Sequence, residues 1–289
     1  MDLPLLTIIG DAWGSTFGGL WDDTAVFRTL FFDFGVMEDN FGRVLHGFWF
    51  TIRLAIFGGV LALTLGLVLA VLRQLPGKPL APVRWLTIAY IDVLRGIPLL
   101  LVLLLISGGL GALAVEDAIP REIGIPRWFG LPDPFWYGVM ALALTYGAYM
   151  AEVYRAGIEA VPPGQMEAAR SLGMSHGKAM RFVIVPQAVR KVIPPLLNDF
   201  IALMKDTSLV AFIGLAEVIR VGQDVQAESF NSSALIVAGV FYLIVTIPLA
   251  RLVDVLIARQ EKRYSRGGGD AAEPAPAGAA GIGQAGGPV

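Results

Sequence analysis

This sequence of 289 residues contains no cysteine and only two histidines. The absence of cysteine excludes disulfide bonds and thiol-ligated metals. His46 and His176 are far apart and have no carboxylates at ligand spacing, so we expect no metal site and no catalytic centre. The chain also lacks a Gly-Lys-Ser/Thr phosphate-binding loop, so any ATP that it uses must be bound by another chain.

Charged residues are scarce as well. They make up 16% of the chain, compared with about 25% in soluble domains. Hydrophobic residues make up 55%, and the mean hydropathy is +0.66. This composition predicts an all-α integral membrane protein that lies in a lipid bilayer and has no nucleic-acid partner.

About 20 apolar residues are needed to cross a bilayer, and four segments meet this requirement. They are 48–72, 88–113, 135–154 and 235–257. The second segment is divided by the sequence Arg95-Gly96-Ile97-Pro98, which predicts a bend or a new helix start at Pro98.

Basic residues indicate the topology and require a fifth span. They follow the first, third and last spans, and such clusters mark cytoplasmic segments. The 163–186 loop and the C-terminus therefore lie on the same side, and an even number of crossings must separate them. We expect the missing span within about residues 192–213, with the N-terminus outside and the C-terminus cytoplasmic. The basic residues are Arg73, Lys78, Arg84, Arg155, Arg170, Lys178, Arg181, Arg190, Lys191, Arg259, Lys262, Arg263 and Arg266.

The 192–213 span is unusually polar. Lipid penalises such groups, so they are expected to face protein or a water-filled cavity, as in the translocation sites of transporters. For Lys205 and Asp206, a solvated pair at the outer interface is an equal alternative. The candidate residues for the translocation path are Glu152, Arg155, Asn198, Asp199, Lys205, Asp206 and Thr207.

Small residues recur every four positions along two spans. Gly58, Ala62, Gly66 and Ala70 line one face of the first, and Ala143, Gly147 and Ala151 line one face of the third. Such faces permit close helix contact, and we favour a seam within the bundle over a dimer interface.

The polar loop at 163–186 has its own helical pattern. Pro163 suits a first helical turn, and Gly173 fits the position just past a helix end. Ser175 is a suitable cap for a second short helix, which we expect Pro186 to interrupt. We expect this pair of helices to expose small residues, namely Ala168, Ala169, Gly173 and Ala179, to a partner's groove. An ordinary solvated cytoplasmic loop is the alternative on physical grounds alone.

Glu167-Ala168-Ala169, Gly173 and the run 183–186 ending at Pro186 resemble the EAA loop of bacterial ABC importer permeases. The runs 90–99, 146–155 and 203–209 are similar to the polar amino-acid branch of that family. The resemblance covers roughly residues 44–262. Val183 and Val185 depart conservatively from its usual Ile and Leu.

The resemblance implies a five-helix transmembrane bundle with short cytoplasmic coupling helices, in the bacterial inner membrane. It implies a second permease subunit, identical or homologous, a cytoplasmic ABC ATPase dimer and an extracytoplasmic solute-binding protein. ATP and Mg²⁺ would be bound by the ATPase, and this chain would bind no cofactor. The residues implied for ATPase coupling are Glu167, Ala168, Ala169, Gly173, Lys178, Arg181 and Pro186.

The predicted function is therefore non-catalytic import of an amino acid, polar or charged, driven by a partner's ATP hydrolysis. An ATP-independent carrier or channel is the alternative, followed by a membrane enzyme or an exporter. We expect three regions: an extracytoplasmic or interfacial segment at 1–43, the permease domain at 44–264, and a disordered Gly/Ala/Pro tail at 265–289.

Overall fold

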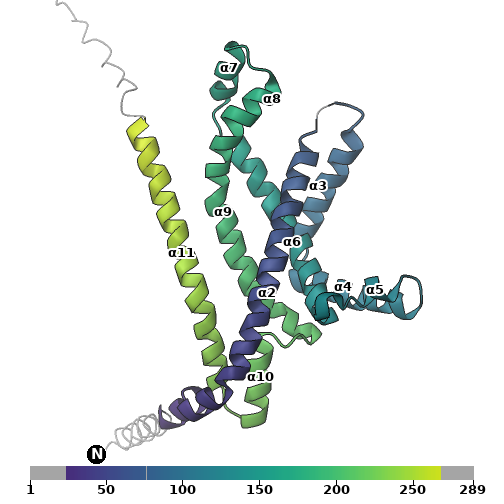
Figure 1. Cartoon of the computed structure of the whole chain (residues 1–289), viewed down its shortest axis with the longest axis vertical. Coiled ribbons are helices and arrows are strands. Elements are labelled where there is room, and N and C mark those ends of the chain that lie inside the picture. The colour runs from purple at the N-terminus through teal and green to yellow at the C-terminus, as the bar shows by residue number, and fades with distance from the viewer. Residues whose placement is uncertain (1–23, 76, 268–289) are drawn as a thin grey trace, which may run out of the picture.

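The computed structural model describes residues 24–75 and 77–267. Within these residues every regular element is helical, and most of the long helices run roughly along one direction (Figure 1). This confirms the all-α fold class. The principal helices are α2 (Phe34–Arg73), α3 (Ala81–Gly96), α4 (Leu99–Val115), α6 (Asp133–Glu159), α9 (Val185–Asp206) and α11 (Ser233–Gly267).

Shorter elements connect them. They are α5 (Arg121–Gly124), the 3₁₀ turns η1 (Trp128–Gly130) and η3 (Thr207–Ile213), α7 (Pro163–Ser171), α8 (His176–Ala179), the π-helical turn η2 (Met180–Ile184) and α10 (Val218–Ser229).

Each of the five predicted spans coincides with one or more of these helices. By length and apolar composition alone, two helices in the described part qualify as spans, the one ending at Arg73 and Ser233–Gln260. The pair α3 and α4 counts as a third if it is one span, and it bends by 106° at the break before Leu99. The bend predicted at Pro98 is confirmed, because proline cannot donate the hydrogen bond that would continue α3.

The first helix is longer than the predicted span. α2 has 40 residues, so it is about 60 Å long and exceeds the bilayer's hydrocarbon thickness. Its start is capped by Asp33, whose carboxylate accepts from the N–H groups of Gly35 and Val36. Residues 34–43, expected in a separate N-terminal segment, therefore belong to this helix. Residues 1–23 lie outside the described part of the chain.

The C-terminal boundary also differs slightly. Residues 265–267, expected in the tail, complete α11. The remainder of the predicted tail, 268–289, lies outside the described residues.

Helix α6 lies at the centre of the hydrophobic core. Its buried Phe135, Leu142 and Met150 pack with Leu54 of α2 and Leu203 of α9. The predicted seam of small residues is confirmed as an intramolecular contact between α2 and α6. A Cβ atom at Gly66 would lie 3.0 Å from the Gly147 carbonyl oxygen, and one at Gly147 would lie 2.9 Å from Leu65. The close approach of the two backbones thus leaves no room for a side chain at Gly66, and a side chain at Gly147 would have to displace the side chain of Leu65.

Candidate functional site

The basic segments of the chain lie together. Figure 1 shows α7, α8, the α2–α3 connection and the C-terminal end of α11 at one end of the molecule. α10 and the start of α2 lie at the opposite end. The helix order thus gathers segments that are separated by up to about 180 residues in the sequence into one polar end. This arrangement agrees with the even number of crossings inferred from the charges.

The α7–α8 hairpin has the turn that its sequence predicts. Gly173 has φ of +82°, a left-handed conformation that glycine adopts without strain. The N–H of Met174 donates to the carbonyl of Ala169, and the N–H of Gly173 donates to that of Arg170. These two bonds form a Schellman cap on α7. Ser175 caps α8 by accepting from the N–H of Lys178 at 3.4 Å, as expected.

Two expectations about the hairpin are wrong. Ala169 and Ala179 are buried, with 3% and 0% of their surface exposed, so neither side chain is available to a partner. Ala169 belongs to α7 and Ala179 to α8, and the folded hairpin encloses both side chains. Small side chains at these positions let α7 approach the helix that follows it.

Pro186 also does not interrupt the helix. The backbone remains helical from α8 through η2 into α9, and Pro186 occupies the first turn of α9. A π-helical turn contains one extra residue, which shifts the hydrogen-bonding register ahead of the proline. Sequence reasoning treated Pro186 as a stop because proline usually breaks the interior of an uninterrupted α-helix.

The exposed face of the hairpin contains residues that sequence reasoning missed. Leu172 is 84% exposed and Phe182 is 63% exposed. They accompany the predicted Glu167, Ala168, Gly173, Lys178 and Arg181, all of which are exposed. Large apolar side chains exposed at a polar end are a signal of an interaction surface, but their exposure is visible only in the folded hairpin.

The predicted path residues do not share one cavity. Glu152 of α6 lies in an ion cluster, where it pairs with Arg73, with Arg155 at 2.7 Å and with Arg95 at 3.7 Å. Asn198 is exposed on α9. Thr207 is fully buried, and its hydroxyl donates to the carbonyl of Met204 at 2.7 Å. The remaining three, Asp199, Lys205 and Asp206, line two different cavities.

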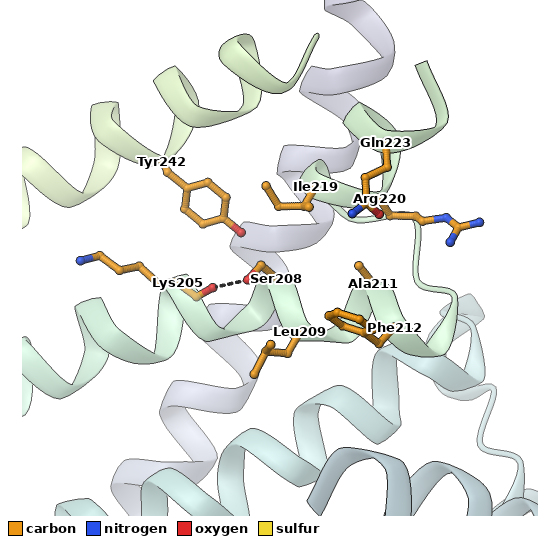
Figure 2. A pocket seen from close by; sticks show the side chains of 9 residues that line it. All are labelled: Lys205, Ser208, Leu209, Ala211, Phe212, Ile219, Arg220, Gln223 and Tyr242. Atoms are coloured by element: carbon orange, nitrogen blue, oxygen red, sulfur yellow. Dashed lines mark hydrogen bonds between the residues drawn. The ribbon is translucent and has the colours of Figure 1, made fainter. Parts of the chain in front are cut away.

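The larger cavity has a volume of about 550 Å³ and lies between η3, α10 and α11 (Figure 2). The cationic heads of Lys205 and Arg220 point to opposite sides, and the hydroxyl of Tyr242 lies between them. Arg220 is paired with Asp224 at 3.1 Å. Of the residues that line this cavity, the sequence analysis predicted only Lys205. It missed those of α10 because this helix contains too few apolar residues to be predicted as part of the bundle.

Glu217, at the start of α10, joins that helix to α2. The carboxylate is fully buried, caps α10 by accepting from the N–H of Arg220 at 2.8 Å, and accepts from the Thr51 hydroxyl at 3.3 Å. A second link lies at the far end of α10, where Arg43 donates two hydrogen bonds to Glu228. These bonds hold the pKa of the exposed Glu228 carboxyl below its usual value.

The smaller cavity, of about 360 Å³, lies where the break between α3 and α4 faces α6 and α9. Asp199 and Asp206 of α9 line it together with Arg95, Tyr146 and Tyr149. The Tyr146 hydroxyl donates to Asp206 at 2.8 Å, and the Tyr149 hydroxyl donates to the carbonyl of Arg95 at 3.3 Å. The helix break predicted from the sequence therefore lies against the polar part of the predicted fourth span.

A family model described as the inner membrane component of binding-protein-dependent transport systems matches residues 62–265. The chain belongs to this family. The permease is 36% identical over 241 residues to the probable glutamine ABC transporter permease protein GlnM of Bacillus subtilis, covering 79% of this chain and 98% of that protein. It is 33% identical to the arginine transport system permease protein ArtQ of the same organism, covering 75% and 92% of the two chains.

Its fold also matches a crystal structure of an amino acid ABC transporter with histidines. The TM-score is 0.68 at 34% sequence identity, covering 78% of the permease and 98% of that chain. The matched family region includes the α7–α8 hairpin, both cavities and all but the last two residues of α11. The expected all-α importer-permease fold is thereby confirmed.

Proposed function

We propose that this chain is the membrane-spanning permease subunit of an ATP-driven importer for amino acids. The family match over residues 62–265 is the observation that carries the proposal. The printed names of the relatives, which concern glutamine and arginine transport, support amino acids as the substrate class. The chain performs no covalent chemistry and alternates between outward- and inward-facing states.

The partners follow from the transport class. Two permease subunits associate with a cytoplasmic ATPase dimer and receive the substrate from an extracytoplasmic solute-binding protein. ATP and Mg²⁺ bind to the ATPase subunits, while this chain contributes the translocation path.

The α7–α8 hairpin is the proposed contact with the ATPase. Its exposed face combines the apolar Leu172 and Phe182 with the charged Glu167, Lys178 and Arg181. A mixed apolar and charged surface on a short helical hairpin fits insertion into a groove of a partner. Gly173 forms the turn between the two helices. When the ATPase moves as a rigid body, the hairpin would move with it and would transmit this movement to α6, which precedes the hairpin in the chain, and to α9, which follows it.

Co-expression with the cognate ATPase tests this function. The two chains should purify together, and proteoliposomes containing the complex should hydrolyse ATP faster when the cognate solute-binding protein and its amino acid are added. The same complex with a hydrolysis-deficient ATPase should not accumulate substrate. Substrate uptake without any ATPase present would refute the proposal and would favour an ATP-independent carrier.

The orientation is tested separately by thiol labelling. The chain contains no cysteine, so single replacements have no background. Glu122→Cys, next to α4 and away from the hairpin, should react with a membrane-impermeant maleimide in intact cells. Ser175→Cys in the hairpin should react only after the membrane is opened. Labelling of Ser175→Cys in sealed cells would reverse the proposed orientation.

A further inference from the structure

A short helix precedes α2 at the end of the molecule opposite the α7–α8 hairpin (Figure 1). It covers residues 24–31, and a two-residue break at Phe32 and Asp33 separates it from α2. The helix lies outside residues 62–265, the region that places the chain in its family. Family membership therefore assigns this helix no role.

Apolar side chains gather on one face of helix 24–31. They follow the spacing i, i+1, i+4 and i+5, which is that of one side of an α-helix: Val26, Phe27, Leu30 and Phe31. The opposite face carries Ala25, Arg28 and Thr29. The rings of Phe27 and Phe31 stack with their centroids 4.8 Å apart. A helix with one aromatic, apolar face and one polar face fits the boundary between water and lipid.

The apolar face is not covered by the rest of the described chain. Phe27 is 55% exposed, and Phe34 at the start of α2 is 79% exposed. Along α2, exposed apolar side chains continue on the same face as Phe34, at Phe41, Leu45 and Trp49, into the predicted span 48–72. A stripe of exposed apolar residues thus extends from the membrane span back to the start of α2, next to helix 24–31.

Hydrogen bonds join helix 24–31 to the connection between α10 and α11. The N–H of Ser232 donates to the carbonyl of Leu30 at 2.7 Å. The side-chain amide of Asn231 donates to the carbonyl of Thr29 at 2.7 Å. These bonds satisfy two of the carbonyl groups that a helix end leaves free, so they fix the end of helix 24–31 to residues 231 and 232.

A third bond sets the depth of this helix in the membrane. The N–H of Asp33 donates to the hydroxyl of Ser233 at 2.9 Å, and Ser233 is fully buried. Ser233 is also the first residue of the helix Ser233–Gln260, which qualifies as a span by length and composition. A helix rises about 1.5 Å per residue, so Ser233 lies about 3 Å from Leu235, where the predicted apolar span begins. The end of helix 24–31 is therefore held at the edge of the hydrocarbon layer.

We propose that the apolar face of helix 24–31 binds membrane lipid at this edge, in the leaflet that is the outer one in the proposed orientation. Phe27 and Leu30 insert among the lipid chains, while Arg28 stays among the headgroups and water. The bonds to residues 231–233 then hold the α10–α11 connection at a fixed depth. This contact goes beyond the proposed function, because it depends on neither the transported amino acid nor the ATPase.

Spin labelling of the full chain in nanodiscs of phosphatidylethanolamine and phosphatidylglycerol tests this contact. The chain contains no cysteine, so a nitroxide can be attached at one chosen position. Phe27→Cys and Leu30→Cys place the label on the apolar face, and Ala25→Cys places it on the opposite face. Collision rates of the label with oxygen, which concentrates in lipid, and with a water-soluble nickel chelate are measured by power saturation of its electron paramagnetic resonance signal.

The ratio of the oxygen rate to the nickel rate should be severalfold higher at Phe27→Cys and Leu30→Cys than at Ala25→Cys. Two further positions calibrate the ratio. Val60→Cys, at an exposed apolar position within the first span, gives the value for lipid. Glu122→Cys, at an exposed position outside the predicted spans, gives the value for water. Each variant is required to elute as a monodisperse particle, and Leu30→Cys keeps the test available if Phe27→Cys does not fold.

Three results would overturn the proposal. The first is a ratio at Phe27→Cys and Leu30→Cys no higher than that at Ala25→Cys or Glu122→Cys. The second is a low collision rate with both reagents, because it would mean that protein covers this face. The third is protection from the nickel chelate that appears only when the cognate solute-binding protein is added, which would make that protein the partner instead of lipid.

Discussion

Replacing Gly66 with valine should cause the largest loss of stability among the changes considered for this chain. A Cβ atom at this position would lie 2.8 Å from Met150, 3.0 Å from the Gly147 carbonyl oxygen and 3.1 Å from the Ala151 nitrogen. Two of these three atoms belong to the backbone of α6 and cannot move aside without separating the helices. Overpacking of this kind costs about 1–3 kcal/mol.

The effect should appear as a lower melting temperature of the detergent-solubilised chain and as a smaller monodisperse fraction in size-exclusion chromatography. Gly239→Val on α11 is the matched control, because a Cβ atom there meets no atom of another element within 4 Å in the described part of the chain. Both variants place valine in an apolar helix, so differences in helix propensity cancel. Equal melting temperatures for the two variants would contradict the close α2–α6 seam.

Replacing Gly173 with tryptophan should have the largest effect on function. Within the described residues, a Cβ atom at Gly173 meets nothing within 4 Å, so the folded chain itself has room for a large side chain. The side chain would instead occupy the space in front of the hairpin, where the proposed ATPase groove closes. We expect membrane insertion and folding to persist, while ATPase co-purification or substrate-stimulated hydrolysis falls by about tenfold or more.

Backbone strain must be separated from this steric effect. Gly173 has φ of +82°, which costs a non-glycine residue about 1 kcal/mol, and asparagine tolerates this conformation best. Gly173→Asn should therefore retain most of the coupling. Normal hydrolysis in the tryptophan variant would remove the hairpin from the interface, whereas equal loss in both variants would assign the effect to the turn instead of the partner.

Several features were predictable because they depend on local sequence. Gly173 after α7 and Ser175 before α8 follow from the conformations that glycine permits and the hydrogen bonds that serine makes at a helix start. The break at Pro98 follows from its missing N–H. The seam between α2 and α6 was readable from a four-residue repeat of small side chains, because that spacing places them on one helix face.

Other features depend on which helix faces meet. Ala169 and Ala179 have the small side chains expected at a docking surface, but the return of α8 towards α7 buries them and leaves Leu172 and Phe182 outside. The sequence alone did not show which polar residues of the fourth span face the same cavity. The rotation of α9 directs Asp199 and Asp206 to one cavity and Lys205 to another, while Thr207 is enclosed.

The sequence by itself determined that the chain is a helical membrane protein, that a helix breaks at Pro98, that the hairpin turns at Gly173, and which end gathers its basic segments. These properties follow from hydropathy, proline, glycine and charge, which act over a few residues. Only the tertiary structure decided that Thr145 of α6, Asp199 of α9 and the α3–α4 break line one cavity. That juxtaposition depends on the packing of three helices around α6, and contacts between residues about 50 positions apart have no local signal in the sequence.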